Sequence, residues 1–271
     1  MPARRFVAAG LVLGFSACNR PAPTASSAAP AAPISEITLS DYAIAAPTTM
    51  PAGYVTFRTR NSGKEDHQAG LIRLDSNKTI DDFRAAVAKS GPPPAWITLM
   101  GGPQNSSEVT IDLTPGNYVW YCMIPGPDGV PHVAKGMLAA MTVTPASGPT
   151  AVPPVADIDV TMHDYQWDLS KPLTAGHHVL KVETAAGQPH EMVLVHLEDG
   201  KTPADVLGWL QKPDGPPPFL TLDGITAMQA GETNYAAVDI VPGQYALFCF
   251  LDAPDGKPHV AHGMVQPFTV Q

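Results

Sequence analysis

The sequence is short of charge, of basic residues and of long apolar runs, and each shortage excludes a class of protein. Only 15% of its 271 residues are charged, and its 16 Lys and Arg are scattered. A nucleic-acid binder would need a basic stripe, which is missing here. The apolar run Phe6–Ala17 is too short to span a membrane. The hydrolase motifs Gly-x-Ser-x-Gly and His-Glu-x-x-His are also missing. What remains is a chain of 44% hydrophobic residues, which can bury real cores.

The N-terminus has the pattern of an export signal, predicted over residues 1–17. Two arginines precede the apolar run, and the small residues Ser16 and Ala17 lead directly into Cys18. A Cys at this place resembles the lipobox of bacterial lipoproteins, with Phe15 where that family usually has Leu, and the resemblance implies lipidation of Cys18. The alternative is an ordinary cleaved signal. Residues 18–33 are rich in Ala, Pro and Ser, which suits a flexible tether to the membrane. We therefore expect an exported, lipid-anchored protein of a bacterial envelope or periplasm.

The rest of the chain is an internal repeat. Six segments recur in one order over about 105 residues, and the last is the most similar, with Pro131–Met137 recurring as Pro258–Met264. The other pairs are Ser40-Asp41-Tyr42 with His163-Asp164-Tyr165, Pro51–Val55 with Thr174–Val179, Asp66-His67-Gln68 with Pro189-His190-Glu191, Gly91–Pro94 with Gly215–Pro218, and Pro115–Tyr118 with Pro242–Tyr245. The sequence thus predicts one domain over 34–145, a linker over 146–155 and a second domain over 156–271.

Each copy has the pattern of a β-sandwich. Alternating or β-branched runs predict strands at Tyr54–Thr59, Val109–Leu113 and Asn117–Cys122, and Pro/Gly turns separate them. One short helix is inserted per copy, at Thr79–Ala88 and at Thr202–Leu210, each with a Thr as the candidate N-cap. The predicted fold class is all-β, with two tandem Greek-key sandwiches.

The duplication sorts eight of the nine histidines of the chain. The residues opposite His163, His177, His196 and His262 in the other copy are not His, so these four are expected to be surface or packing positions. Two His, one Cys and one Met recur in both copies, and the His follows the Cys by ten residues and the Met follows that His by five. The recurring residues are His67, Cys122, His132 and Met137 in the first copy, and His190, Cys249, His259 and Met264 in the second.

The two copies resemble cupredoxins, the blue-copper family of plastocyanin, amicyanin and azurin. The segment Ala186–Val193 is similar to the first-ligand strand of plastocyanin, and the ending Cys249…Pro258–Met264 is similar to the ligand loop of the family. Two His, a Cys thiolate and a distant axial Met form the ligand set of electron-transfer copper. The resemblance implies that the two recurring sets above are two type 1 copper sites, with copper as the cofactor. The chain departs from the small cupredoxins in the nine residues between Cys and His, where its turn formers would let the loop fold out and return.

Two cysteines in an exported protein would first suggest a disulfide. Cys122 and Cys249 hold the same place in the two copies, so a bond between them would need a two-fold, face-to-face arrangement of the domains. We therefore expect two free thiols.

The expected function is that of a blue-copper electron carrier that docks on redox partner proteins of the envelope, through Val133, Ala134, Val260 and Ala261. The alternative is a non-redox module that buffers or delivers copper, or mediates envelope contacts. We expect that the chain is not an enzyme. It has no His-x-His pair of the kind that laccase-like enzymes use, and no His next to either Cys, where copper nitrite reductases have one.

Overall fold

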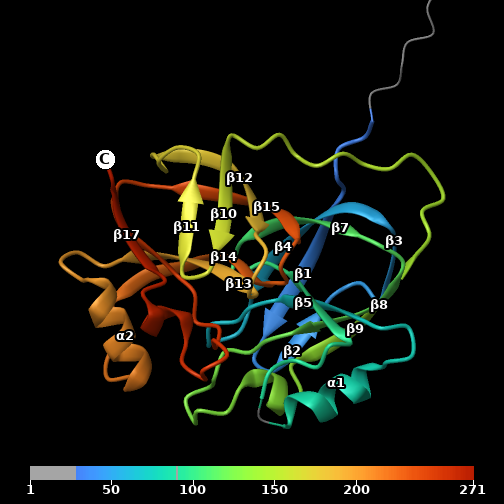
Figure 1. The fold of residues 1–271 in the computed structure, drawn as a ribbon, viewed down its shortest axis with the longest axis horizontal. Helices are drawn as coiled ribbons and strands as arrows, with labels where there is room; N and C mark the ends of the chain where they lie inside the picture. Colours follow the sequence, from blue (N-terminus) through green and yellow to red (C-terminus); the bar gives the residue numbers. More distant parts are fainter. Residues whose placement is uncertain (1–28, 90) are drawn as a thin grey trace, which may run out of the picture.

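The computed structural model describes residues 29–89 and 91–271. The predicted signal (1–17) and Cys18 lie outside the described residues. The predicted all-β class is confirmed, and the fold is a two-domain β-sandwich (Figure 1). The strands of the first copy are β1 (Ile34–Ser40), β2 (Ala43–Ala45), β3 (Thr49–Pro51), β4 (Gly53–Asn61), β5 (Gly70–Leu74), β6 (Ile97–Gly101), β7 (Glu108–Leu113), β8 (Gly116–Tyr121) and β9 (Leu138–Thr144). Those of the second copy are β10 (Ile158–His163), β11 (Gln166–Leu169), β12 (Gly176–Thr184), β13 (His190–Leu197), β14 (Phe219–Met228), β15 (Thr233–Ile240), β16 (Gly243–Phe248) and β17 (Val265–Val270).

The strands form two sheets, and each sheet runs through both copies. The eight-stranded sheet has the order β11-β10-β12-β15-β7-β4-β1-β2, and the nine-stranded sheet has the order β17-β16-β13-β14-β6-β5-β8-β9-β3. Along β4 buried and half-buried residues alternate, so that one face of the eight-stranded sheet lines the interior. In contrast, β5 and β13 of the nine-stranded sheet are buried at nearly every position. The ligand-bearing strands β5, β8, β13 and β16 all lie in the nine-stranded sheet.

Both inserted helices form as predicted, α1 over Ile80–Val87 and α2 over Pro203–Gln211. Each begins with a capping box, in which the N-cap Thr and the Asp three residues later bond to each other's backbone N–H. In Figure 1 the helices lie outside the sheets, α2 at the lower left and α1 at the lower right. Phe83 of α1 packs in a cluster with Val133, so this helix covers the imidazole loop of the first copy. The expectation that Val133 belongs to an exposed docking patch is wrong, because its side chain is only 3% exposed.

A pseudo-two-fold axis relates the two copies. The two sheets join across it through β7 with β15 and through β6 with β14, both antiparallel. Cys122 and Cys249 are 127 residues apart, so Val109 corresponds to Ala236, and these two residues are paired with each other. A residue that pairs with its own counterpart lies on the axis, as in the self-complementary interface of a two-fold dimer.

The second sheet crosses the same axis with reciprocal hydrogen bonds. The Thr226 N–H donates to Gly102 O (2.9 Å), and the Gln104 N–H donates to Gly224 O (3.3 Å). Asn234 adds a buried side-chain bond, since its amide donates to Met100 O across the junction (2.7 Å). One hydrophobic core extends through both copies. The copies are therefore joined edge to edge rather than face to face, and the predicted free thiols are confirmed at both Cys122 and Cys249.

The predicted domain boundaries remain a prediction, because the sheets continue from one copy into the other. At the end of the predicted tether, Ala31 forms a parallel bridge with Val152 of the linker, and the Val152 N–H donates to Pro30 O (2.9 Å). These tether residues are therefore held against the linker. Among the described residues, no helix has the length and apolarity to cross a membrane.

The close backbone approach at Gly224 gives a test of this fold. A Cβ at Gly224 would lie 2.0 Å from Met192 O, on the strand that carries His190, and the φ of Gly224 is +110°. We expect Gly224→Ala to lower the free energy of unfolding by roughly 2–4 kcal/mol, because the backbone has to shift. Chemical denaturation followed by circular dichroism measures this change.

Gly208→Ala is the matched control for this substitution. A Cβ at Gly208 meets nothing within 4 Å. Because Gly208 lies inside α2, Ala there should stabilise the chain by about 0.8 kcal/mol. Equal effects of the two substitutions would contradict the close approach at Gly224.

Candidate metal centres

The Cys, the second His and the Met of each copy lie on one loop that leaves the end of a strand. In the first copy this loop follows β8, and its backbone closes on itself. The Cys122 N–H donates to Met137 O (3.3 Å), and the Met137 N–H donates to His132 O (3.0 Å). The nine-residue insert folds out and returns where the His132 N–H donates to Ile124 O (3.0 Å). The second copy repeats these bonds between Cys249 and Met264, Met264 and His259, and His259 and Leu251.

The first His of each set comes from another part of the sheet. His67 lies just before β5 and His190 begins β13, and each of these strands pairs with the strand that ends at the Cys. The Gln68 N–H donates to the Cys122 sulfur (3.4 Å), which ties the residue after His67 to the thiol. The structure thus brings together the two His and the Cys of each copy.

The ligand atoms converge in both copies. Within each group, His67 with Cys122 and His132, and His190 with Cys249 and His259, one atom per residue lies within 4.8 Å of the others. In the first copy the two Nδ1 atoms are 3.1 Å apart, and the thiol sulfur is 3.5 Å from Nδ1 of His132. In the second copy the sulfur is 3.3 Å from Nδ1 of His259. All six side chains are buried, and Met137 and Met264 are fully buried.

An aspartate fixes the tautomer of the first His in each copy. Asp41 Oδ1 lies 3.1 Å from Nε2 of His67, and Asp164 Oδ1 lies 3.0 Å from Nε2 of His190. Backbone N–H groups, chiefly that of Lys64, hold the pKa of Asp41 below its usual value, and the Gln188 N–H does the same for Asp164. An ionised carboxylate only accepts hydrogen bonds. Nε2 therefore carries the hydrogen, and Nδ1 keeps its lone pair for a metal.

The second His is fixed by a different residue in each copy. Glu65 Oε2 lies 2.8 Å from Nε2 of His132, whereas Gln188 Oε1 lies 3.3 Å from Nε2 of His259. Both oxygens accept, so these imidazoles also direct the lone pair of Nδ1 into the centre. A Tyr covers the same rings edge-on, Tyr42 at His132 (5.3 Å between ring centroids) and Tyr165 at His259 (5.2 Å).

The centres have the donor chemistry of a soft metal. Two lone pairs 3.1 Å apart repel each other unless a proton or a cation lies between them. In the second copy Nδ1 of His190 is buried with no hydrogen-bond partner at all, which is costly without a ligand. Two imidazole nitrogens and one thiol form the equatorial donor set of type 1 copper, so the residues fit this metal.

The imidazoles are neutral and ready to bind a metal ion. The thiols are protonated, so metal binding has to release a proton from each of them. Burial lowers the pKa of His67, His190 and His259, which keeps these rings neutral. Burial also raises the pKa of Cys122 to about 11 and raises that of Cys249. A metal ion therefore has to displace a proton from each thiol when it binds.

One buried acid distinguishes the second centre. Glu191, the residue after His190, has Gln68 as its counterpart, and its carboxylate accepts the N–H of Phe250 (2.8 Å), the residue after Cys249. Burial raises the pKa of Glu191 to about 7.

The histidines set aside by the sequence comparison lie outside both ligand groups, as predicted. His163 and His177 pair with exposed acids, Asp168 and Asp239. His196 stacks on Tyr245, with 4.4 Å between ring centroids. His262 binds Asp255 (3.1 Å) and stacks on Tyr165, so it borders the second centre without entering it. His178, which the sequence analysis did not discuss, is buried between Asp157 and the carbonyl of Thr174.

The residues that orient the ligands were not predicted from the sequence. The repeated Asp-Tyr pairs, Asp41-Tyr42 and Asp164-Tyr165, were recognised only as part of the repeat. In the structure the Asp binds the first His and the Tyr covers the second, and both tyrosines have a left-handed backbone (φ 67° and 69°). Such a conformation is uncommon for a bulky residue and is typical of a functional site. The recurrence of the same Asp-Tyr pair in both copies was the available signal.

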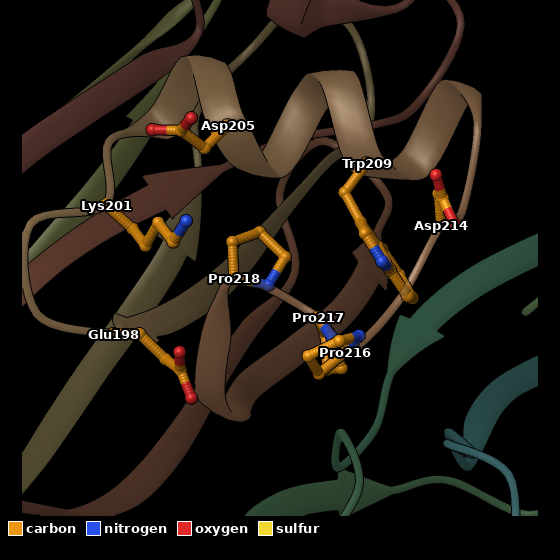
Figure 2. A pocket seen from close by; sticks show the side chains of 8 residues that line it. All are labelled: Glu198, Lys201, Asp205, Trp209, Asp214, Pro216, Pro217 and Pro218. Carbon is orange, nitrogen blue, oxygen red and sulfur yellow. The ribbon is translucent and has the colours of Figure 1, made fainter.

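A pocket next to α2 is separate from the centres. Figure 2 shows Trp209 and the three prolines Pro216–Pro218 lining it, together with Glu198, Lys201, Asp205 and Asp214. This lining contains neither His nor Cys, so the pocket lacks the donors of the two centres.

The chain is similar to solved structures of copper proteins, while no family model and no curated protein matches it. Dithionite-reduced auracyanin from the photosynthetic bacterium Roseiflexus castenholzii is 27% identical over 42% of this chain and 99% of its own, with a TM-score of 0.29. A multicopper oxidase is 14% identical over 88% of each chain, with a TM-score of 0.23. The copper-containing nitrite reductase of Thermus scotoductus is 11% identical over 88% of this chain and 61% of its own, with a TM-score of 0.24.

The resemblance to cupredoxins is confirmed. The two His–Cys–His groups fit type 1 sites, and the similar structures include auracyanin and cupredoxin-fold copper proteins. The two groups support copper binding, with up to two type 1-like copper sites.

The expectation that the chain is not an enzyme is wrong. The similar structures include multicopper oxidases, a laccase and a nitrite reductase, all of them enzymes. The missing His-x-His motif was therefore not sufficient ground to exclude enzymes.

The aspartates give a test of the centres. We expect Asp41→Ala to weaken Cu(II) binding at the first centre by about 10- to 100-fold, because the ring of His67 loses its orientation and its basicity. Competition titration of the full chain carrying Cys249→Ala, in which only the first centre is complete, measures this affinity. Asp168→Ala, at the exposed pair with His163, is the matched control and should leave the affinity unchanged. Equal losses from the two substitutions would refute the role of Asp41.

Proposed function

We propose that the chain is a copper protein that transfers electrons through one type 1-like site in each copy. The proposed ligands are His67, Cys122, His132 and Met137 in the first site, and His190, Cys249, His259 and Met264 in the second. One observation carries the proposal. In each copy, two buried imidazoles have Nε2 engaged by a side-chain oxygen, so that both Nδ1 atoms are directed at a buried thiol.

The residues of the chain hold the ligands in place before any metal arrives. Copper, when bound by such a set, exchanges one electron between Cu(II) and Cu(I). The closed backbone from Cys122 to Met137 and the carboxylate on His67 restrain ligand movement during that exchange. Burial of all the ligands excludes water from the centre. A rigid, dry ligand set suits repeated electron transfer, whether the electron passes to another protein or to a substrate.

The setting that we propose is the bacterial cell envelope, with lipid at Cys18 as the anchor and redox proteins of the envelope as partners. The sequence alone supports this setting, through the basic and apolar N-terminus that leads into Cys18.

A non-redox role in copper buffering or delivery is the second candidate, and one observation favours it. The outer nitrogen of His132 is covered by Glu65, and the neighbouring Val133 is packed under α1. The imidazole edge of the first site is thus less open to a redox partner than an exposed ring would be.

Copper titration of the purified chain tests the proposal. We expect two Cu(II) per chain and an intense visible thiolate-to-copper band that ascorbate bleaches and ferricyanide restores. Cys122→Ala and Cys249→Ala should each remove one copper and part of the band, and the double variant should remove both. Copper binding without reversible bleaching would favour buffering or delivery, and the lack of any thiolate band would refute the proposed sites.

A further inference from the structure

The two centres differ in the charge that contacts the second imidazole. Glu65 and Gln188 occupy the same place, two residues before His67 and His190. Glu65 accepts from Nε2 of His132 with a carboxylate oxygen and also accepts from the hydroxyl of Tyr42 (3.0 Å). Gln188 accepts from Nε2 of His259 with its amide oxygen, while its amide nitrogen donates to the hydroxyl of Tyr165 (3.1 Å). The same two contacts are thus made by an acid in one copy and by a neutral amide in the other.

We propose that Glu65 makes the first site the more reducing of the two, so that an electron shared within the chain comes to rest at the second site. This inference rests on the proposed function. A carboxylate hydrogen-bonded to a ligand imidazole makes the ring more basic and brings a negative charge near the metal. Both effects stabilise Cu(II) more than Cu(I), because Cu(II) carries the larger charge. Gln188 provides the hydrogen bond without the charge.

The position of Glu65 lets its charge act on the site. The ring of His132 is fully buried and the side chain of Glu65 is only 24% exposed, so water and salt screen this pair less than a surface pair. Lys135 is the nearby cation, and its ammonium is bound to Asp128 (2.7 Å) and to the hydroxyl of Tyr42 (3.3 Å). Asp128 thus compensates the positive charge of Lys135. The negative charge of Glu65 therefore still acts on the site.

The contact between Lys135 and Asp128 has a counterpart in the second copy. His262 takes the place of Lys135 and binds Asp255, the counterpart of Asp128. Glu191 is a buried acid of the second copy, and the first copy has Gln68 in its place. Its carboxylate is turned to the N–H of Phe250 rather than to either imidazole. The potentials are therefore also measured with Glu191→Gln, which keeps an oxygen to accept that bond.

Reciprocal exchange of the two residues tests the inference. The one-electron midpoint potential of each site is measured by optical titration of the full chain, with Cys249→Ala to isolate the first site and Cys122→Ala to isolate the second. We expect the first site to have the lower potential. Glu65→Gln should change the ratio of Cu(II) to Cu(I) affinity at the first site at least tenfold in favour of Cu(I), a rise of 59 mV for one electron. Gln188→Glu should lower the potential of the second site.

Glu36→Gln is the matched control, because it removes the same charge from an exposed side chain of β1. Glu36 lies five residues before Asp41, about 16 Å along an extended strand, which exceeds the screening length of about 10 Å in 0.1 M salt. Glu36→Gln should change the ratio of Cu(II) to Cu(I) affinity at the first site by less than threefold.

The outcomes separate this inference from the proposed function. The inference is overturned if the two sites cycle reversibly with equal potentials. It is also overturned if Glu65→Gln and Gln188→Glu shift the potentials of their sites in the same direction. Either result leaves the proposed electron transfer unaffected. A chain without any thiolate-to-copper band overturns both. If Glu65→Gln prevents folding, the exchange at Gln188 still decides the question, because an unchanged potential there refutes the role of the charge.

Discussion

The hydrogen bond between a side-chain oxygen and the outer nitrogen of each imidazole determines how both centres are arranged. A neutral imidazole has one donor and one acceptor nitrogen, so binding the donor at Nε2 leaves the lone pair at Nδ1. Asp41 and Asp164 do this for the first His of each copy, and both carboxylates are kept ionised by backbone N–H groups. The converging lone pairs are consequences of that bond, and together with the buried thiol they give the site its preference for a soft metal.

The tandem arrangement adds a second constraint. The two copies behave like the halves of a two-fold dimer whose sheets merge, since Val109 pairs with Ala236 on the pseudo-axis. The first-ligand strands β5 and β13 are separated only by β6 and β14 in the same sheet. The centres are thus built into one continuous framework, in which the acid at Glu65 and the amide at Gln188 break the symmetry. A duplication that keeps the ligands and changes one contact residue can give two similar sites different affinities for an electron.

Much of the fold and of the site could be predicted from the residues. Alternation identified the main strands, a Thr before an acid-rich segment identified each helix, and the recurring residues identified the atoms that converge. Val133 was placed wrongly, on a docking surface, because an apolar residue beside a ligand has the same pattern whether a partner or α1 covers it. The exclusion of enzymes also failed, because a motif comparison tests only the motifs that are considered.

The sequence by itself determined the duplication, the types of ligand and their spacing, because donor chemistry belongs to the residue type and a repeat is visible in the order of residues. Only the tertiary structure decided which oxygen lies on which imidazole, since Asp41 and His67 are 26 residues apart and meet through the packing of the chain between β1 and β5. It also decided that the copies share their sheets, because strand pairing across the axis depends on backbone register and on Gly102 and Gly224, whose carbonyls accept hydrogen bonds across it. Those long-range contacts convert two lists of ligands into two centres, one with a carboxylate and one with an amide on the second imidazole.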